Sequence, residues 1–207
     1  MSPLSRRAFA AAVLTTPLLA GCGGSGSGSS GAPDSPPRSA PSSGKSAAPR
    51  GRSVPVRLRI PDIGVDTPVM RLGLAADGTV EVPPITAHDR AGWYEHSPTP
   101  GQTGPSVILG HVRVGSYGDG VFRRLGELRR GDRIEARLEN GGTAAFAVTE
   151  VRTVAKADFP AGAVYGNVDR PELRLITCGG PRSGAGYRDN VIVFAASTDA
   201  AGDTGER

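Results

Sequence analysis

Cysteine is scarce in this chain of 207 residues, which has only two, Cys22 and Cys178. Cys22 ends the run Leu19-Ala20-Gly21-Cys22 near the N-terminus, where a processing site is expected. Cys178 therefore has no disulfide partner in the rest of the chain, which excludes a disulfide-stapled fold. In a compartment that favours disulfides, an unpaired cysteine is either an inert buried side chain or a reactive group kept for its chemistry.

Long apolar runs are also missing. The apolar stretch from Ala8 to Ala20 has roughly 13 residues, whereas a helix that spans a bilayer needs about 20. Arg6 and Arg7 precede it, and this order is typical of a secretory signal, which we place at residues 1–22. The arginine pair also resembles a twin-arginine export motif, so the chain is exported either by that route or by the general secretory route.

The small residues before Cys22 resemble a lipoprotein processing site. Processing would leave Cys22 as a diacylated N-terminus, and two acyl chains hold a protein at a membrane surface. In the alternative interpretation, Cys22 has no role. Residues 23–53 lack large apolar side chains and are predicted to be a disordered linker with a span of roughly 30 Å. Residues 198–207 are predicted to form a disordered tail.

The positive charge is unevenly placed. The net charge is +4 and the pI is about 9.5, but the basic excess lies before Ser53, and the remaining chain is slightly negative. A basic leader and linker suit an anionic membrane surface. The domain has no basic stripe interleaved with aromatic residues, which argues against nucleic acid as a partner. No His, Cys or carboxylate cluster has metal-ligand spacing, and we expect no metal or organic cofactor.

Residues 54–197 form one predicted domain with a period of two. Alternation predicts strands over 54–60, 133–138 and 146–154, with a hairpin turn at Asn140-Gly141-Gly142. The continuous apolar runs 105–112 and 191–196 are typical of central strands covered on both sides. A helix is indicated only over 121–128. Many short strands with frequent Gly and Pro favour a β-barrel or a β-sandwich.

The strand predicted over 172–178 carries Cys178 at its end. Leu173, Leu175 and Thr177 share one face, and Arg174, Ile176 and Cys178 share the other. If the leucines point inward, the thiol points outward beside an arginine, in the partly exposed, electropositive setting that favours thiolate. The opposite phase would bury an inert cysteine.

A thiol nucleophile needs a base or imidazolium and a donor for the oxyanion. Of the three histidines, His88 and His96 lie in loops and are most simply solvated, whereas His111 follows an apolar strand that would hold it rigidly. Arg188 precedes the last strand and is the natural cation near Cys178. Taken alone, His111 could be structural, and Arg188 could be a surface residue paired with Asp189.

The ordered set Gly110-His111, Leu175-Ile176-Thr177-Cys178 and Arg188 resembles the signature of the sortases, cysteine transpeptidases of Gram-positive cell surfaces. Arg59-Ile60-Pro61 and Gly92-Trp93-Tyr94 resemble the N-terminal part of that family. Arg174 stands where the signature has a threonine, and the domain looks most like the actinobacterial class E and F branches. The resemblance implies an all-β, closed sortase-type barrel of about eight strands with one or two short helices.

The resemblance also implies an activity. Cys178 would attack a sorting signal of Leu-Pro-x-Thr-Gly or Leu-Ala-x-Thr-Gly type, and His111 would protonate the leaving amine. Arg188 would donate hydrogen bonds, and Ile176 and Thr177 would contact the substrate. The implied partners are sorting-signal-bearing surface proteins and an amine from a cell-wall precursor or a pilin. We expect a monomer on the outer face of the cytoplasmic membrane.

Three alternatives stay open. An L,D-transpeptidase would place its cysteine in a Ser-His-Gly-Cys context, which Ile176-Thr177-Cys178 does not match. A non-catalytic lipoprotein could bind a cell-wall peptide in a groove of the same fold, with Cys178 unreactive. A dimer linked through Cys178 is the third possibility.

Overall fold

The computed structural model describes residues 52–184 and 186–199. The predicted leader, Cys22 and almost all of the predicted linker lie outside the described residues, as does most of the predicted tail. The predicted domain over 54–197 is described except for residue 185.

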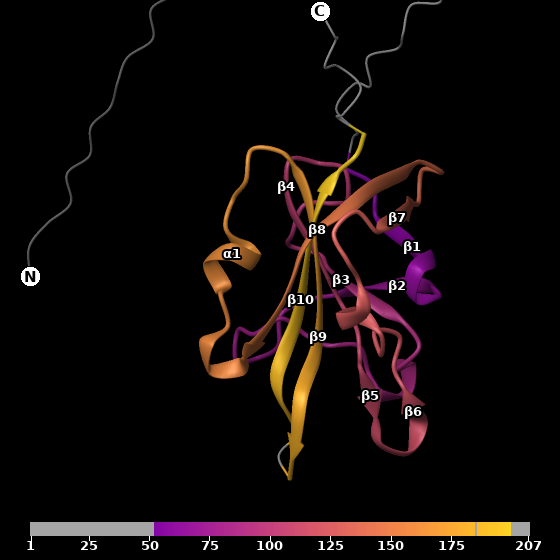
Figure 1. Cartoon of the computed structure of the whole chain (residues 1–207). Helices are drawn as coiled ribbons and strands as arrows, with labels where there is room; N and C mark the ends of the chain where they lie inside the picture. Colours follow the sequence, from indigo (N-terminus) through magenta and orange to yellow (C-terminus); the bar gives the residue numbers. More distant parts are fainter. Residues whose placement is uncertain (1–51, 185, 200–207) are drawn as a thin grey trace, which may run out of the picture. The chain divides into compact units, whose positions relative to one another are not determined.

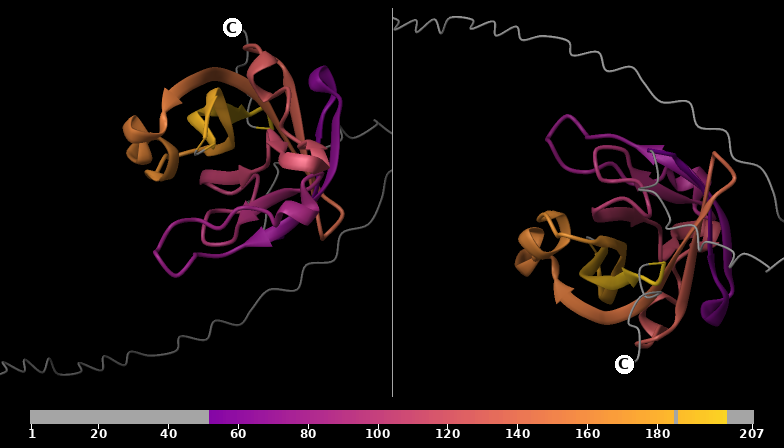
Figure 2. Two further views of the ribbon diagram at one scale, coloured as in Figure 1. Left: turned by 90° about the horizontal axis from the view of Figure 1, so that it is seen from below. Right: turned by 90° about the horizontal axis from the view of Figure 1, so that it is seen from above.

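Eight strands close into one barrel, in the order β1-β2-β3-β4-β9-β10-β8-β7 (Figures 1 and 2). All neighbours pair antiparallel except β2 with β3 and β4 with β9, which are parallel. The barrel strands are β1 (Pro55–Ile60), β2 (Val65–Leu72), β3 (Ala91–Tyr94), β4 (Gly104–Leu109), β7 (Arg133–Leu138), β8 (Thr143–Ala155), β9 (Pro171–Ser183) and β10 (Gly186–Ser197). The predicted all-β barrel is confirmed.

Every predicted strand is present, but β2 and β3 are not among the predicted strands and several bounds differ. The strand predicted to end at Cys178 continues to Ser183, the strand predicted over 105–112 ends at Leu109, and the last strand begins at Gly186. The predicted hairpin joins β7 to β8, and Gly141 adopts a φ of 82°, which a residue with a Cβ rarely adopts. A small hairpin of β5 (Arg113–Val114) and β6 (Gly118–Asp119) stands apart from the barrel.

The helix predicted over 121–128 is wrong. That segment holds only the 3-10 turn η4 (Leu125–Glu127), although Phe122, Leu125 and Leu128 are all buried. These three residues recur at every third position because each packs against the barrel, and the segment between them is not a continuous helix. The other 3-10 turns are η1 (Pro61–Ile63), η2 (Ile85–Ala87), η3 (Gly115–Tyr117) and η5 (Lys156–Asp158).

The one α-helix in the described part of the chain is α1 (Ala161–Tyr165), on the connection between β8 and β9. Its five residues are too few to show a helical period in the sequence. No helix within 52–184 and 186–199 has the length and apolar character required to cross a membrane.

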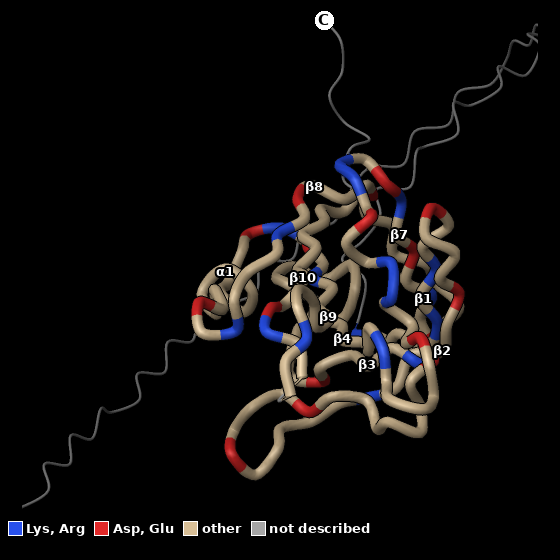
Figure 3. The backbone as a smooth tube through the Cα atoms, turned by 60° about the horizontal axis from the view of Figure 1, so that its bottom comes forward, with Lys and Arg blue, Asp and Glu red and all other residues tan. Residues whose placement is uncertain are grey.

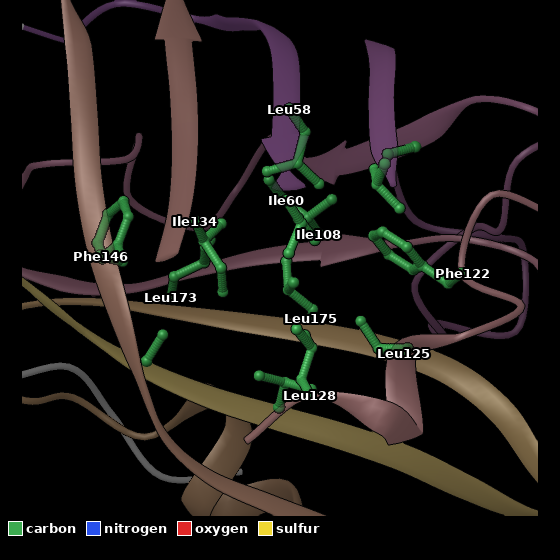
Figure 4. Close-up of a cluster of buried hydrophobic side chains, with 14 of the residues drawn as sticks. Leu58, Ile60, Ile108, Phe122, Leu125, Leu128, Ile134, Phe146, Leu173 and Leu175 are labelled. Carbon is green, nitrogen blue, oxygen red and sulfur yellow. The ribbon is translucent and has the colours of Figure 1, made fainter. Parts of the chain in front are cut away.

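Two apolar clusters cover the two faces of the central strands. The barrel core contains Leu173, Leu175, Val191 and Val193 from β9 and β10, together with the side chains shown in Figure 4. A second set, which we call the outer cluster, packs between α1 and the opposite face of β4, β9 and β10: Val107, Val164, Ile176, Ile192 and Phe194. This double coverage explains the continuous apolar runs of β4 and β10.

The β9–β10 hairpin extends past the end of the barrel (Figure 1). β4 pairs with β9 only as far as Ile176, and β8 pairs with β10 only from Asp189 onward. Cys178 therefore lies at the level where the closed barrel gives way to a two-stranded ribbon.

Candidate active site

Cys178 is a free, half-exposed thiol near the barrel end of β9. The strand alternates as expected, because Leu173 and Leu175 lie in the barrel core and Ile176 lies in the outer cluster. A strand directs alternate side chains to opposite faces, so Cys178 shares the outward face of Ile176. Backbone pairing on both sides of this level holds the thiol in place.

His111 lies beside Cys178, just after the end of the neighbouring strand β4. Leu109 of β4 pairs in parallel with Ile176, and the Gly110 N–H donates to the Ile176 carbonyl at 3.1 Å. Extending this pairing by two residues along each segment places His111 opposite Cys178. A Cβ on Gly110 would point at Phe122 in the barrel core, so the next side chain, that of His111, points outward like Cys178.

The imidazole of His111 is held by a long-range contact. Its Nε2 atom lies 2.6 Å from the carbonyl oxygen of Pro83, in the segment between β2 and β3. A carbonyl oxygen only accepts hydrogen bonds, so Nε2 must carry a hydrogen. This leaves Nδ1 as the ring nitrogen free to exchange a proton with the thiol or the substrate.

The backbone of His111 is held in place by the segment that follows β6. The Phe122 N–H donates to the His111 carbonyl at 2.9 Å, and a Cβ on Gly120 would overlap that carbonyl and lie 2.7 Å from the His111 Cβ. Only glycine leaves room for this approach.

We expect Gly120→Ala to impair turnover more than folding. The added methyl group must displace the His111 backbone, and a shift of about 1 Å in a catalytic group can cost roughly a hundredfold in rate. Gly162→Ala on α1 is the matched control, because a Cβ there meets nothing within 4 Å. Peptide-cleavage kinetics and thermal melts of both variants test this, and equal kinetics for the two would contradict it.

On the other side of Cys178, its direct cross-strand partner is Asn190 of β10. Arg188 lies two residues further out, where the register shifts and Gly180 adopts a φ of 71°. It is exposed and lines a pocket of about 330 Å³ with Lys156, Pro181 and others, distinct from the cleft that Cys178 lines. Within the described residues Arg188 has no ion pair, not even with Asp189.

Arg174 does not supply the expected positive charge beside the thiol. It is 3% exposed, its Nη2 lies 2.5 Å from the Glu172 carboxylate, and its Nε donates to the carbonyl of Ala163 on α1 at 3.3 Å. Its guanidinium also stacks 4.7 Å from the ring centre of Phe194. Burial alone would raise the pKa of Glu172, but its hydrogen bonds with Arg170 and Arg174 outweigh this and lower it. Arg174 thus anchors α1 over the outer cluster.

Replacing Arg174 with methionine should destabilise the domain by about 3 kcal/mol, because the change leaves the largely buried Glu172 carboxylate with only the exposed Arg170 as a partner. Arg152→Met is the control. Arg152 also lies 4.7 Å from the Phe194 ring and pairs with Glu150, but its side chain is 41% exposed, so we expect a loss below about 1 kcal/mol. Urea unfolding of both variants measures the difference. A similar loss in each would refute the anchoring role.

The two residues expected to contact substrate lie on opposite faces. Ile176 is buried in the outer cluster, beneath the α1 connection. Thr177 is buried toward the barrel interior, and its hydroxyl oxygen has no hydrogen-bond partner. Aromatic rings of Tyr94, Phe159 and Tyr165 pack edge-on or tilted at 6.1–6.3 Å beside Ile176's cluster, which gives the thiol-bearing face an apolar approach.

The other two histidines contact other aromatic rings. His88, at the C-terminal end of η2, is half-buried rather than solvated as expected, and its ring is tilted by 41° against that of Tyr117. His96 is exposed beside Tyr94. Within the described ranges, no group of three or more His, Cys, Asp or Glu residues is arranged to hold a metal ion.

The structure is a closed β-barrel with an outward-facing cysteine beside a histidine, and comparisons specify the family. Residues 58–198 match the sortase domain family. This span is more than half of the chain, so the protein belongs to the sortase family, whose members are extracytoplasmic cysteine transpeptidases. No match to the chain is found among curated proteins.

Solved structures with the same fold include sortases of several classes. Sortase C-1 from Actinomyces oris is 21% identical with a TM-score of 0.53, over 69% of this chain and 72% of its own. The lid mutant of sortase A from Corynebacterium diphtheriae is 20% identical with a TM-score of 0.55, over 72% of each chain. The sortase D5 transpeptidase from Clostridium perfringens is 23% identical with a TM-score of 0.52, over 70% and 78%.

Proposed function

We propose that this protein is an exported transpeptidase that cleaves a sorting signal through a thioester on Cys178 and transfers the acyl group to an amine. One observation carries this proposal: His111, just after the end of β4, lies opposite Cys178 of β9, and both side chains are directed outward. An imidazole beside a partly exposed thiol favours the thiolate that a nucleophile requires.

In the proposed mechanism, the Cys178 thiolate attacks the Thr carbonyl of the signal. The C–S bond forms, the amide C–N bond breaks, and His111 gives a proton from Nδ1 to the departing glycine amine. In the second half, an incoming amine attacks the thioester carbonyl, the C–S bond breaks, and the amine's proton passes back to His111. The Pro83 carbonyl keeps the ring oriented throughout because it binds the opposite nitrogen.

The donor signal is proposed to lie along the apolar surface between the outer cluster and α1. A Leu-Pro or Leu-Ala pair would bury apolar area against Tyr94, Leu109 and Tyr165, of which the first two are half-buried and the last is exposed. Ile176 forms the floor of this surface. Arg174, which stands in place of the threonine of the signature, fixes the α1 wall of this surface from within. Assignment of the domain to the class E and F branches is part of the proposal and rests on the sequence resemblance alone.

The decisive test is mass spectrometry of the purified domain with a panel of peptides of Leu-Pro-x-Thr-Gly and Leu-Ala-x-Thr-Gly type. We expect an adduct with the mass of the acyl fragment on Cys178 and loss of the glycine fragment. A non-catalytic peptide-binding protein would retain the intact peptide without any adduct. That outcome, with every peptide that binds, would reject the proposed function.

We further propose that Arg188 donates hydrogen bonds to the substrate or the oxyanion. It lies on the outward face two residues beyond Asn190, a separation of roughly 7 Å along a strand, and no described carboxylate neutralises it. Arg188→Lys keeps the charge but loses the planar fork, so kcat/KM should fall by more than about tenfold. Asn190→Ala is the comparison, because Asn190 is the direct partner of Cys178. A larger loss in Asn190→Ala than in Arg188→Lys would transfer the role to Asn190.

The proposed setting is the outer face of the cytoplasmic membrane, where lipidated Cys22 tethers a monomer through the linker. The proposed partners are sorting-signal-bearing surface proteins and an amine from a cell-wall precursor or a pilin. Globomycin-type inhibition of lipoprotein processing tests the tether: the full chain should then keep its leader, whereas an unlipidated protein would mature normally.

A further inference from the structure

The cleft that Cys178 lines is open to solvent, and we call it the arginine cleft. It has a volume of about 650 Å³ and lies between the β9–β10 hairpin and the segment that follows β6. The charged residues of its lining are four basic side chains and one acidic side chain: Arg113, Arg123, Arg124, Arg182 and Glu127.

This concentration of charge is local. Residues 53–199 contain as many acidic as basic residues, and Figure 3 shows the two signs interspersed over the barrel. A cleft lined by one sign of charge raises the local concentration of ligands of the opposite sign. The arginine cleft is therefore an anion-attracting feature in an otherwise balanced domain.

The carboxylates near the cleft do not neutralise it. Arg113 and Arg123 share one partner, Asp119, at 3.4 and 3.3 Å, and Arg124 pairs with Glu127. Arg182 has no ion pair within the described residues and lies 5.4 Å from the ring centre of Tyr187. Four guanidinium groups thus face two carboxylates, which leaves donors available for a ligand.

The cleft lies on the side of β9 opposite to the donor surface. Thr177, Gly179 and Val191 line it, and these residues belong to the inward face of the hairpin, whereas Ile176 and α1 lie on the outward face. Cys178 lies at the boundary between the arginine cleft and the donor surface. An acyl group held on its sulfur can thus be reached from the cleft while the donor peptide occupies the other side.

We propose that the arginine cleft binds the amine acceptor, and that the preferred acceptor carries a carboxylate within about three residues of its attacking amine. This inference rests on the proposed transpeptidase function. The amine nitrogen forms a C–N bond with the thioester carbonyl carbon as the C–S bond breaks, and the carboxylate binds the guanidinium groups of Arg182 and Arg123. An arginine fork matches a carboxylate in planar, bidentate geometry.

The test compares two acceptors that differ only in charge, triglycine and triglycinamide, on acyl-enzyme formed beforehand from the same donor peptide. The enzymes are the unaltered protein, the double variant Arg123→Gln with Arg182→Gln, and the control Arg137→Gln. Arg137 is exposed on β7 and lines a different pocket. Because each enzyme meets both amines, the intrinsic reactivity of the amines cancels in the comparison.

We expect the unaltered enzyme and Arg137→Gln to prefer triglycine by about fivefold to tenfold in kcat/KM, a range that two exposed ion pairs can supply. The double variant should lose that preference, and raising NaCl should reduce it in the other two enzymes. Equal use of both acceptors by the unaltered enzyme would overturn the inference, as would an unchanged preference in the double variant. Failure to form any acyl-enzyme would instead count against the proposed function.

Discussion

Replacing Cys178 with alanine should abolish acyl-enzyme formation and lower sorting-signal cleavage by at least about a thousandfold, as for other covalent nucleophiles. Without the sulfur no thioester forms, and the remaining groups can only orient the peptide. The change should hardly affect folding, because Cys178 is half-exposed and makes no disulfide among the described residues. Loss of stability should stay within about 0.5 kcal/mol.

Two measurements on this variant separate catalysis from structure. Thermal melts should coincide with those of the unaltered protein, and a fluorescent sorting-signal peptide should bind with similar affinity. Cys178→Ser is the stricter comparison: it keeps a nucleophilic oxygen of similar size but not the acidity of a thiol, so it should also be inactive. Substantial cleavage by either variant would show that Cys178 is not the nucleophile.

The strands of this barrel could be predicted because their side chains alternate over long stretches. Residues 133–138 alternate strictly, and the turn at Asn140 and Gly141 joins them to their partner as the sequence indicates. The outward face of Cys178 on a central strand could also be predicted, since the run from Leu173 shows which face is inward. The strand end could not, because β9 continues past Cys178 to Ser183. The features that could be predicted depend on local pattern alone.

What the sequence could not indicate are contacts between distant segments. The Pro83 carbonyl that holds His111 comes from a loop 28 positions earlier, and no local pattern links them. Arg174 looks like an exposed strand residue until α1 covers it, and α1 is too short to predict. The register of β9 with β10 shifts by one residue between Tyr187 and Asp189, beside Gly180, and this shift places Asn190 rather than Val191 directly opposite Cys178.

The arginine cleft is the clearest example of this limit. Arg113, Arg123 and Arg182 come from three separate segments of the chain. The return of the chain after β6 to the base of the β9–β10 hairpin brings them together. Composition therefore predicted a nearly neutral domain and missed a positive site within it.

The second large effect concerns His111, and two substitutions distinguish its catalytic role from a structural one. The amide nitrogen of glutamine reaches about as far as Nε2, and that of asparagine about as far as Nδ1. His111→Gln can therefore keep the hydrogen bond to the Pro83 carbonyl but cannot transfer a proton. His111→Asn loses both the contact and the chemistry.

If His111 is the general acid, both variants should lose about 10²- to 10⁴-fold in kcat, the range typical of a missing proton donor, with little change in KM for the donor peptide. His111→Gln should then be as inactive as His111→Asn even though its melting temperature stays closer to that of the unaltered protein. If His111→Gln instead restored turnover along with stability, the imidazole would serve only to hold the loop at Pro83, and the proton would have to come from another group at the mouth of the barrel.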